Sequence, residues 1–514
     1  MTTKIGAGSP VVLPGIPATV DPQPVIAQML RRASSLGFEA WWQRAQSVGY
    51  CAHPIQLVGT DQYGREKIVW ARCNNRRATV CPSCSDLYAR DTWQLVHAGC
   101  AGGHHDIPAT VSTHPQMFVT LTATSFGPVH SVAGNVCRDH RRVGEFRRCP
   151  HGKPLWCSAN HNHNDTAVGQ PLCAECYDYL GHVLFTWHLP ELWRRFTITL
   201  RRNLVKNLKS QGISPSSVRV SFVKVVEMQA RAIPHIHSLI RLDPTTAPGG
   251  LDDYGPAATS GGGEHRHDTG HAWQPSIIAA ELAALIQQVA RTVSFEVPDP
   301  NADDPDEAPA LNMRFGTQVD TQPISAEHVV AQYDLSEQRN GVGRLSPHRV
   351  AGYLAKYVTK SLQDLGISAR RLSSEAIADL DISEHVRNIL VAIGQFGDRA
   401  CQLGIDSLTG IGRWLHTLGY RGHITTKSRR YSTTLGALRA RRHQWTHQQA
   451  AADAPVSQTD CADQTVPEIR SDVCWEFERA GHSSLGDRVL VVSAAYRHIK
   501  TRRIGQSEYR SIRR

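Results

Sequence analysis

Cysteines crowd into the first third of this 514-residue chain. The cysteines that precede residue 177, out of 13 in all, are Cys51, Cys73, Cys81, Cys84, Cys100, Cys137, Cys149, Cys157, Cys173 and Cys176. In a reducing cytosol, such clustering favours metal ligation over a framework of disulfides. We therefore expect bound metal ions to hold the N-terminal third together.

A first zinc site is predicted from four of these cysteines. Cys81 and Cys84 have the tight spacing of a zinc knuckle, and Cys51 and Cys73 lie upstream. A redox-active Cys-x-x-Cys is the alternative, but no thioredoxin-like sequence surrounds this pair. We expect these four thiolates to bind a structural zinc ion.

A second zinc site is expected between residues 137 and 176. This segment holds more candidate ligands than one tetrahedral site can use, namely Cys137, Cys149, Cys157, Cys173 and Cys176, with His140 and His151 nearby. The set we predict is Cys149, Cys157, Cys173 and Cys176, with Cys137 as a further candidate. The remaining cysteines lack partners at ligand spacing and are expected to be ordinary thiols.

Length and composition restrict the class of protein. Single hydrophobic cores stop growing near about 250 to 300 residues, so this chain is expected to hold two or three units. Hydrophobic residues make up 41% of the chain, but no stretch approaches the roughly 18 apolar residues of a membrane span. The N-terminus also lacks the pattern of a signal peptide, and we expect a cytoplasmic protein without a membrane partner.

Positive charge is concentrated near the C-terminal end of the chain. The net charge of +10 favours an anionic partner such as nucleic acid. The segment from Gly412 to His447 contains no Asp or Glu. We expect Lys427, Arg429 and Arg430 in this segment to contact DNA, while a solvated basic face is the alternative.

Changes in composition divide the chain into segments. Residues 1–25 are rich in Pro, Gly and Thr and are predicted to be a disordered lead-in, and residues 26–115 are expected to hold the first zinc site. Residues 116–362 form the predicted central domain, and residues 363–447 the basic DNA-contacting region. Residues 448–514 are expected to comprise a linker and a small C-terminal segment.

Insertions interrupt the predicted central domain. One is the second zinc segment at residues 137–176. Flexible insertions are predicted at residues 243–274 and 297–310, because these are too poor in apolar residues to bury a core. Between them, Ile277 to Val293 has the apolar spacing of an amphipathic helix, as does Val25 to Val48 earlier in the chain.

Two strand-like segments carry candidate chemistry. Met117 to Thr122 (MFVTLT) alternates apolar and hydroxyl residues, and an ordinary core strand is the alternative interpretation. Ser217 to Leu242 has the pattern of a hairpin with a polar break. On its second strand His235 and His237 are two residues apart, so both imidazoles project from one face and can reach one divalent ion. The other His-x-His pairs lie in polar, loop-like sequence that lacks such a rigid strand.

A third segment, Gly352 to Lys360 (GYLAKYVTK), carries two tyrosines four residues apart. On a helix this spacing puts Tyr353 and Tyr357 on one face, one turn apart. A buried aromatic stripe is the usual explanation for such a pair. The neighbouring Lys356 and Lys360 suit attack on a phosphate better than a core.

In this order, the three segments resemble the motifs of HUH rolling-circle initiators, which are a TLT strand, a His-hydrophobic-His strand and a Tyr-x-x-Lys-Tyr helix. The tyrosine motif is especially similar to that of the gene A replication proteins of small single-stranded DNA phages. From roughly residue 40 to residue 445 the chain looks like the replication initiators of actinobacterial plasmids and integrative elements.

The resemblance implies an α+β fold, an HUH endonuclease domain in which a central antiparallel sheet carries His235 and His237 and the tyrosine helix packs against it. It also implies that these histidines hold Mn²⁺ or Mg²⁺, which polarises the scissile phosphate. A hard ion prefers oxygen as well as nitrogen, so Glu227 near the hairpin turn is our candidate third ligand. An exposed turn carboxylate is the alternative.

The resemblance further implies that Tyr357 is the nucleophile. Its attack would leave a 5′-phosphotyrosine and a free 3′-OH for polymerase. Tyr353 takes the place of the second phage tyrosine, which permits a second strand transfer, although a packing role is the alternative. Lys356 or Lys360 would stabilise the phosphorane-like transition state.

The expected partners follow from this chemistry. They are single-stranded and origin DNA, a host polymerase and a host helicase, because the sequence contains no P-loop and implies no nucleotide cofactor. Two rival hypotheses remain open. One is a two-tyrosine HUH transposase, and the other is a non-enzymatic, zinc-dependent DNA-binding regulator.

Overall fold

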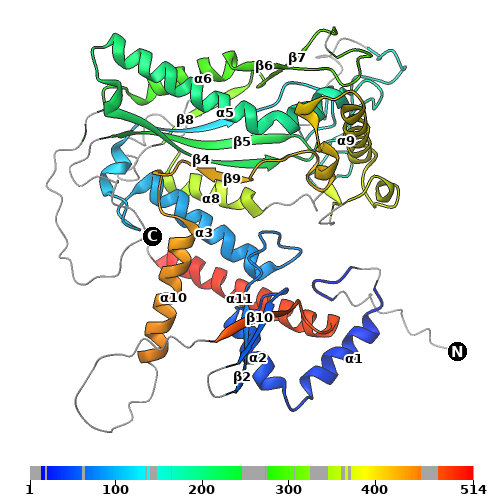
Figure 1. Ribbon diagram of the computed structural model, residues 1–514, viewed down its shortest axis with the longest axis vertical. Coiled ribbons are helices and arrows are strands. Elements are labelled where there is room, and N and C mark those ends of the chain that lie inside the picture. The colour runs from blue at the N-terminus through cyan, green and yellow to red at the C-terminus, as the bar shows by residue number, and fades with distance from the viewer. Residues whose placement is uncertain are drawn as a thin grey trace. The chain divides into compact units, whose positions relative to one another are not determined.

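The computed structural model divides the chain into two compact units (Figure 1). One unit comprises Met1–Asp91 with Leu435–Arg514, and the other is Thr92–Thr434. The structure describes all residues of the chain except 1–12, 18–19, 61–63, 133–135, 139–146, 164, 246–272, 274, 306, 325–344, 360–364, 368–371, 453–472 and 513–514.

The unit that contains both chain ends is built on a three-stranded antiparallel sheet. β10 (Cys474–Ala480) pairs with β1 (Ile55–Thr60), which pairs with β2 (Glu66–Ala71). α1 (Pro22–Ala33) packs against α11 (Leu485–Ile512). The Arg32 guanidinium of α1 donates two hydrogen bonds of 2.8 Å to the buried Asp487 carboxylate of α11.

The predicted segmentation of the two chain ends is therefore corrected. Residues 448–514 supply a strand and a helix to the same unit as the N-terminal region, and local composition carries no signal of such distant pairing. The predicted lead-in also ends earlier than residue 25, because α1 begins at Pro22 behind the N-cap Asp21. The expected helix from Val25 to Val48 is two helices, α1 and α2 (Phe38–Ser47).

The second unit is built on a five-stranded sheet in which all neighbouring strands are antiparallel. Its strands, in spatial order, are β8 (Val319–Pro323), β3 (Gln116–Leu121), β5 (Pro234–Pro244), β4 (Val218–Met228) and β9 (Thr425–Lys427). The expected mixture of helices with an antiparallel sheet is confirmed. The strand that carries both histidines, β5, is the central one.

Helices cover both faces of this sheet. Figure 1 shows α5 (Tyr179–Ser210) and α6 (Ala279–Thr292) on one side and α8 (Pro347–Thr359) on the other. Alternate strand residues, such as Val119 and Ile236, enter the core beneath α5 and α6. Because strand side chains alternate, the residues between them point to the side of α8.

The remaining predicted boundaries also shift. β5 continues to Pro244, so the start of the predicted insertion at residue 243 lies in a strand, while residues 246–272 fall outside the described residues. At the second predicted insertion, Val297 ends strand β6 (Ser294–Val297), which pairs with β7 (Leu311–Arg314). The amphipathic helix expected at Ile277 to Val293 is confirmed as α6.

The predicted basic region at residues 363–447 is shared between the two units. α9 (Glu384–Gln402) packs against α5 in a second hydrophobic core, and β9 forms an edge of the large sheet. α10 (Leu435–Ala452) belongs to the other unit. Among the described residues, no helix combines the length and apolar character needed to cross a bilayer.

A buried ion pair holds the end of β5 that lies away from the histidines. Arg241 donates to Asp243 with N–O distances of 2.6 and 2.9 Å, and each side chain is 1% exposed. His114 Nδ1 and Ser221 Oγ also contact this carboxylate at 2.9 and 2.6 Å. Burial raises the pKa of Asp243, but Arg241 and these hydrogen bonds outweigh it and hold the pKa well below its usual range.

Asp243→Asn is expected to lower the free energy of unfolding by about 3 to 5 kcal/mol, because it leaves the Arg241 charge buried without its partner. Since the carboxyl pKa is depressed in the folded state, its contribution is present above the unfolded pKa and disappears as pH falls through the folded pKa. Chemical denaturation at pH 7 measures the first effect, and a series of denaturation curves below about pH 4, the ordinary carboxyl pKa, follows the gradual onset of the second. The exposed Asp303→Asn is the control, and an equal effect of the two substitutions would contradict the interpretation.

Candidate active site and metal centres

The two histidines of β5 lie on the face of the sheet that α8 covers. His237 Nε2 is 3.0 Å from Glu227 Oε2, and Glu227 on β4 stands directly opposite His235 in the strand register. All three side chains are buried. Glu227 is thus a buried strand residue in contact with a histidine and not an exposed turn carboxylate.

The contacts of His235 differ from those of His237. Its Nδ1 is 3.0 Å from Gln229 Nε2, and its Nε2 is 3.4 Å from the Arg231 guanidinium. Burial, together with the charges of Arg231 and His237, lowers the pKa of His235 to about 3. The imidazole is therefore neutral near pH 7, which is the form that binds metal.

Two imidazole nitrogens and a carboxylate, from His235, His237 and Glu227, form a donor set that could hold a divalent metal ion. The three donors are not gathered as closely as in the cysteine-containing groups described below. To bind an ion, one ring nitrogen of His235 must give up its contact with Gln229 or with Arg231, while the contact of the other nitrogen can remain.

The TLT segment, one of the three motif segments of the sequence, contributes to the site through a contact that the sequence did not predict. Thr120 on β3 stands opposite His237, and its Oγ1 is 3.2 Å from His237 Nδ1. The two ring nitrogens of His237 are thus held between a hydroxyl and a carboxylate. This pair of contacts fixes the orientation of the ring. Thr122, the other threonine of this segment, instead donates its hydroxyl to the backbone carbonyl of Gln318 at 2.9 Å.

The two tyrosines of α8 lie against His237. The ring centroids of Tyr353 and Tyr357 are 4.5 Å apart, and they lie 5.1 and 5.6 Å from the centroid of the His237 ring. The buried face of α8 is formed by other residues, namely Pro347, Val350, Ala351, Leu354, Ala355 and Val358. The tyrosines therefore do not belong to the face of α8 that packs into the hydrophobic core, and Tyr353 is 38% exposed.

The surroundings of the tyrosines are only partly basic. Lys356 is exposed, and its Nζ lies 5.7 Å from the centroid of the Tyr357 ring. Lys360 lies outside the described residues. Burial, followed by the effects of Tyr357 and Glu227, raises the pKa of Tyr353, so its phenol is neutral near pH 7.

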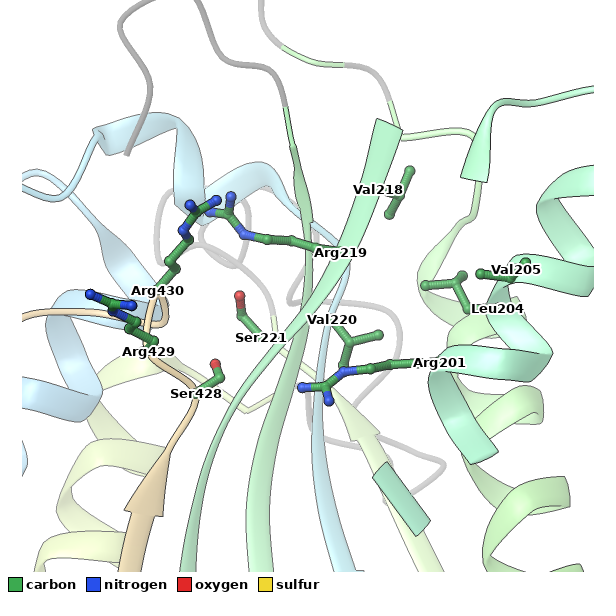
Figure 2. Close-up of a pocket in the computed structure, with 10 residues that line it drawn as sticks. All are labelled: Arg201, Leu204, Val205, Val218, Arg219, Val220, Ser221, Ser428, Arg429 and Arg430. Atoms are coloured by element: carbon green, nitrogen blue, oxygen red, sulfur yellow. The ribbon is translucent and has the colours of Figure 1, made fainter. Parts of the chain in front are cut away.

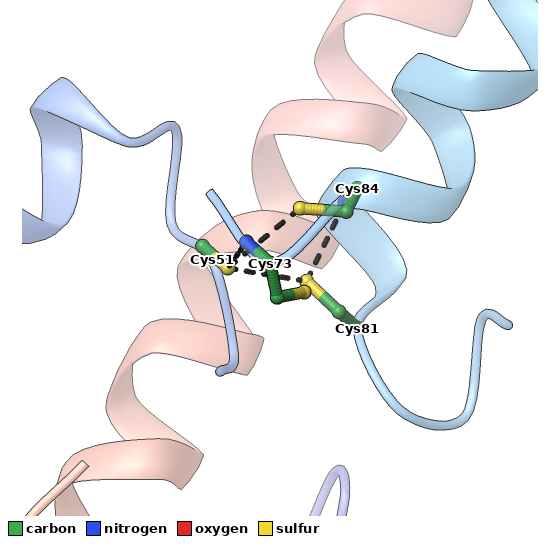
Figure 3. Close-up of side chains that lie close together, drawn as sticks. All are labelled: Cys51, Cys73, Cys81 and Cys84. Carbon is green, nitrogen blue, oxygen red and sulfur yellow. Dashed lines mark hydrogen bonds between the residues drawn. The ribbon is translucent and has the colours of Figure 1, made fainter. Parts of the chain in front are cut away.

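Among the described residues, three groups of Cys and His side chains could each hold a metal ion, with donor atoms within 4.8 Å of one another. The Cys51 group contains Cys51, Cys73, Cys81 and Cys84, the set predicted for the first zinc site (Figure 3). Its Cys51 sulfur lies 3.7 Å from the sulfur of Cys81 and 3.6 Å from that of Cys84. A zinc ion with Zn–S bonds of about 2.3 Å gives tetrahedral S–S distances of about 3.8 Å.

Several elements position the Cys51 group. Cys51 follows α2, Cys73 follows β2, and Cys81 and Cys84 lie at the start of α3 (Pro82–Ala101). The backbone N–H of Ala52 donates to the Cys81 sulfur at 3.2 Å. Val491 and Val492 of α11 pack in the same hydrophobic cluster, so the metal group lies where both ends of the chain meet.

The predicted second zinc site is divided between two groups. The His130 group contains His130, Cys137, Cys157 and His161, and the Cys149 group contains Cys149, His151, Cys173 and Cys176. Cys157 was therefore grouped with the wrong partners, because spacing along the chain does not show which turns meet in space. His161 belongs to one of the His-x-His pairs in polar, loop-like sequence, and it was not predicted to be a ligand. His140 lies outside the described residues.

Comparison with known proteins identifies the family. The family model described as "Replication initiator protein, pSAM2" matches residues 37–496. The chain belongs to this replication initiator family. A replication initiator protein of Streptomyces ambofaciens is 34% identical over 511 residues, covering 93% of this chain and 95% of that protein. No solved structure matches the initiator.

The initiator also has a basic cavity of about 360 Å³ at the end of its large sheet (Figure 2). Arg201 of α5, Arg219 of β4 and the loop residues Arg429 and Arg430 line it, and its described lining includes no acidic side chain. Figure 2 shows the Arg219 and Arg430 guanidinium groups pointing toward one another. Arginine groups that converge in this way are suited to bind phosphate oxygens.

Lys427, which was expected to contact DNA, is hydrogen-bonded within the protein, and its contact with DNA stays a prediction. Its ammonium donates to the carbonyls of Ser428, Arg429 and Ser432 at 3.4, 3.3 and 3.0 Å. Burial lowers the pKa of this amine. Lys427 therefore stabilises the loop that presents Arg429 and Arg430.

Proposed function

We propose that this initiator nicks one strand of origin DNA as an HUH endonuclease and stays covalently attached to it through Tyr357. The observation that carries the proposal is the contact of both tyrosine rings with His237, whose Nε2 contacts Glu227. A nucleophile pair, a nitrogen donor and a carboxylate thus converge from β4, β5 and α8. This is the constellation that metal-assisted transesterification needs.

The proposed reaction is an exchange of ester bonds. The Tyr357 oxygen attacks the scissile phosphorus, a phosphotyrosyl bond forms, and the bond from phosphorus to the 3′ oxygen breaks. The phenol proton is lost to a base and the 3′ oxygen gains a proton, so the numbers of ester bonds and protons are unchanged. No nucleotide cofactor is required, and a host polymerase extends the 3′-OH while a separate host helicase unwinds the duplex.

The surrounding side chains support this step. When bound by His235, His237 and Glu227, Mn²⁺ or Mg²⁺ would polarise the phosphate oxygens. Thr120 holds the His237 ring, as its 3.2 Å contact with Nδ1 indicates. Lys356 lies on the same helix turn as Tyr357, where its charge can offset the charge that develops on the phosphate.

Tyr353 is proposed as a second nucleophile. Its ring centroid lies 4.5 Å from that of Tyr357, and both rings contact the same histidine. Two phenols at one site allow the DNA strand to pass from one tyrosine to the other after a round of replication. A pure packing role would not place a ring that is 38% exposed beside a buried histidine.

His237→Ala is expected to reduce Mn²⁺-dependent nicking by more than about 100-fold, because it removes a proposed metal ligand at the centre of the site. The assay incubates the purified full chain with Mn²⁺ and labelled single-stranded DNA from the origin, and denaturing electrophoresis resolves the nicked and covalent products. The exposed His423→Ala is the matched control. DNA binding without nicking by the wild-type chain, with zinc retained, would instead favour a DNA-binding regulator.

The basic cavity is proposed to bind the DNA backbone. Arg429→Ala and Arg430→Ala are each expected to weaken DNA binding about equally for all sequences, because phosphate contacts carry little base information. Each should reduce the slope of log affinity against log salt by about 1. Binding titrations at several salt concentrations measure this slope, with Arg413→Ala as a control outside the cavity lining. An unchanged slope in both variants would place the DNA elsewhere.

A further inference from the structure

Metal ligands from two groups alternate along residues 130–176. In chain order the pairs are His130 and Cys137, Cys149 and His151, Cys157 and His161, Cys173 and Cys176. The first and third pairs form the His130 group, and the second and fourth form the Cys149 group. We propose that these four pairs make a cross-braced module that binds two zinc ions and supports the turn of the β4–β5 hairpin.

The donor distances of the His130 group fit one tetrahedral zinc ion. His130 Nδ1 is 3.2 Å from His161 Nε2, and Cys157 Sγ is 3.5 Å from His161 Nε2. Zinc bonds of about 2.0 to 2.3 Å predict about 3.3 Å between two nitrogens and about 3.6 Å between nitrogen and sulfur. His161 Nδ1 lies 2.6 Å from Asp165 Oδ2, and a carboxylate in this place orients a zinc-bound imidazole.

The Cys149 group has a similar geometry. His151 Nδ1 lies 3.1 Å from the sulfur of Cys176 and 3.7 Å from that of Cys173. A tight turn presents the first pair, because the backbone N–H of Cys149 donates to the Lys153 carbonyl at 2.9 Å. Neither group belongs to the proposed nicking site, since their donors come from the segment between β3 and α5.

The His130 group is joined to the hairpin through Gly169. The backbone N–H of Gly169 donates to the His130 carbonyl at 2.9 Å, and the backbone N–H of His130 donates to the Gln170 carbonyl at 2.8 Å. Gly169 has a φ of +90°, and a Cβ added to it would lie 2.7 Å from the carbonyl atoms of Ala230 and 2.8 Å from the nitrogen of Arg231. Only glycine allows this close approach between module and hairpin.

The hairpin turn supported in this way holds His235. Gln229 Nε2 and the Arg231 guanidinium contact the two ring nitrogens of His235. The turn itself is closed by hydrogen bonds between Gln229 and Ile233 and between Ala232 and Gln229. The module therefore acts through the turn on a proposed metal ligand, and this part of the inference rests on the proposed function.

The zinc content of the purified full chain tests the module without any activity assay. With two ions in the module and one in the Cys51 group, inductively coupled plasma mass spectrometry should find three zinc ions per chain. Cys157→Ser and Cys149→Ser should each remove one ion, and the double variant should remove two. A wild-type content of two ions, or loss of the same single ion by all three variants, would overturn the cross-brace. If a variant fails to fold, the number of zinc ions in the wild-type chain still distinguishes a module with two ions from one with a single ion.

A glycine pair tests the support of the hairpin. Gly169→Ala should retain three zinc ions but raise the Mn²⁺ concentration for half-maximal nicking about tenfold, and amide hydrogen exchange of Gln229 to Ile233 should become faster. Gly212→Ala is the matched control, because Gly212 has a φ of +70° and lies outside the module and the hairpin, and a Cβ there meets no described atom within 4 Å. Identical exchange in the two variants would overturn the supporting role, even if the wild-type chain nicks no DNA.

Discussion

Tyr357→Phe is expected to abolish the covalent protein–DNA adduct and to slow nicking by more than about 10³-fold, because the substitution removes only the attacking oxygen. The ring that stacks with His237 at 5.6 Å remains, so folding and DNA binding should be unchanged. Denaturing electrophoresis with Mn²⁺ and labelled origin DNA measures the adduct, and a binding titration on the same samples measures DNA affinity.

Two other tyrosine variants complete this experiment. Tyr353→Phe should retain the first nick and lose the second strand transfer, which a second labelled strand would detect. Tyr496→Phe, a substitution of an exposed tyrosine in the other unit, should behave like the wild type. If Tyr357→Phe formed the adduct at the wild-type rate, the assignment of the nucleophile would be wrong.

The second large effect concerns the Cys51 group. Cys81→Ser is expected to unfold the unit that contains both chain ends, because a structural zinc site contributes about 10 kcal/mol or more, comparable with the whole stability of a domain. The thiolates lie in the same hydrophobic cluster as Val491 and Val492 of α11, so loss of zinc should also release the C-terminal helix. Limited proteolysis of the full chain and its zinc content would show both changes.

The control for this prediction is another cysteine of the same unit. Cys474 is exposed on β10 and lies outside the three metal groups of the described residues. Cys474→Ser should leave the zinc content and the proteolytic pattern of the chain unchanged. Equal resistance of the Cys81→Ser and Cys474→Ser variants to protease would contradict a structural role for the Cys51 group.

Much of the candidate site could be predicted from the sequence, because it follows local periodicity. A period of two places His235 and His237 on one strand face, and a separation of four places Tyr353 and Tyr357 on one helix face. Glu227 was chosen as a candidate ligand because a hard ion prefers an oxygen ligand and the hairpin brings β4 beside β5. Each of these inferences needs only one element or two adjacent ones.

Other features depend on contacts between segments that are distant in sequence. The pairing of β1 with β10 joins residues near positions 55 and 480, and local sequence composition does not predict this pairing. Thr120 contacts His237 only because β3 lies beside β5. The alternation of the His130 and Cys149 groups was missed for the same reason, since proximity in sequence had suggested one zinc site. Arg201 and Arg219 join the basic cavity from α5 and β4, outside the basic segment.

The central claim is that the Tyr357 oxygen becomes bonded to a DNA phosphate, and mass spectrometry of the adduct tests it most directly. Trypsin cleaves after Arg349, Lys356 and Lys360, so the two tyrosines fall in different peptides, VAGYLAK and YVTK. After incubation with Mn²⁺ and origin DNA, followed by nuclease and trypsin, we predict a nucleotide on Tyr357 in the wild type and none in His237→Ala. Zinc-loaded chain that binds DNA across a tiled origin set yet carries no modified tyrosine would contradict the account.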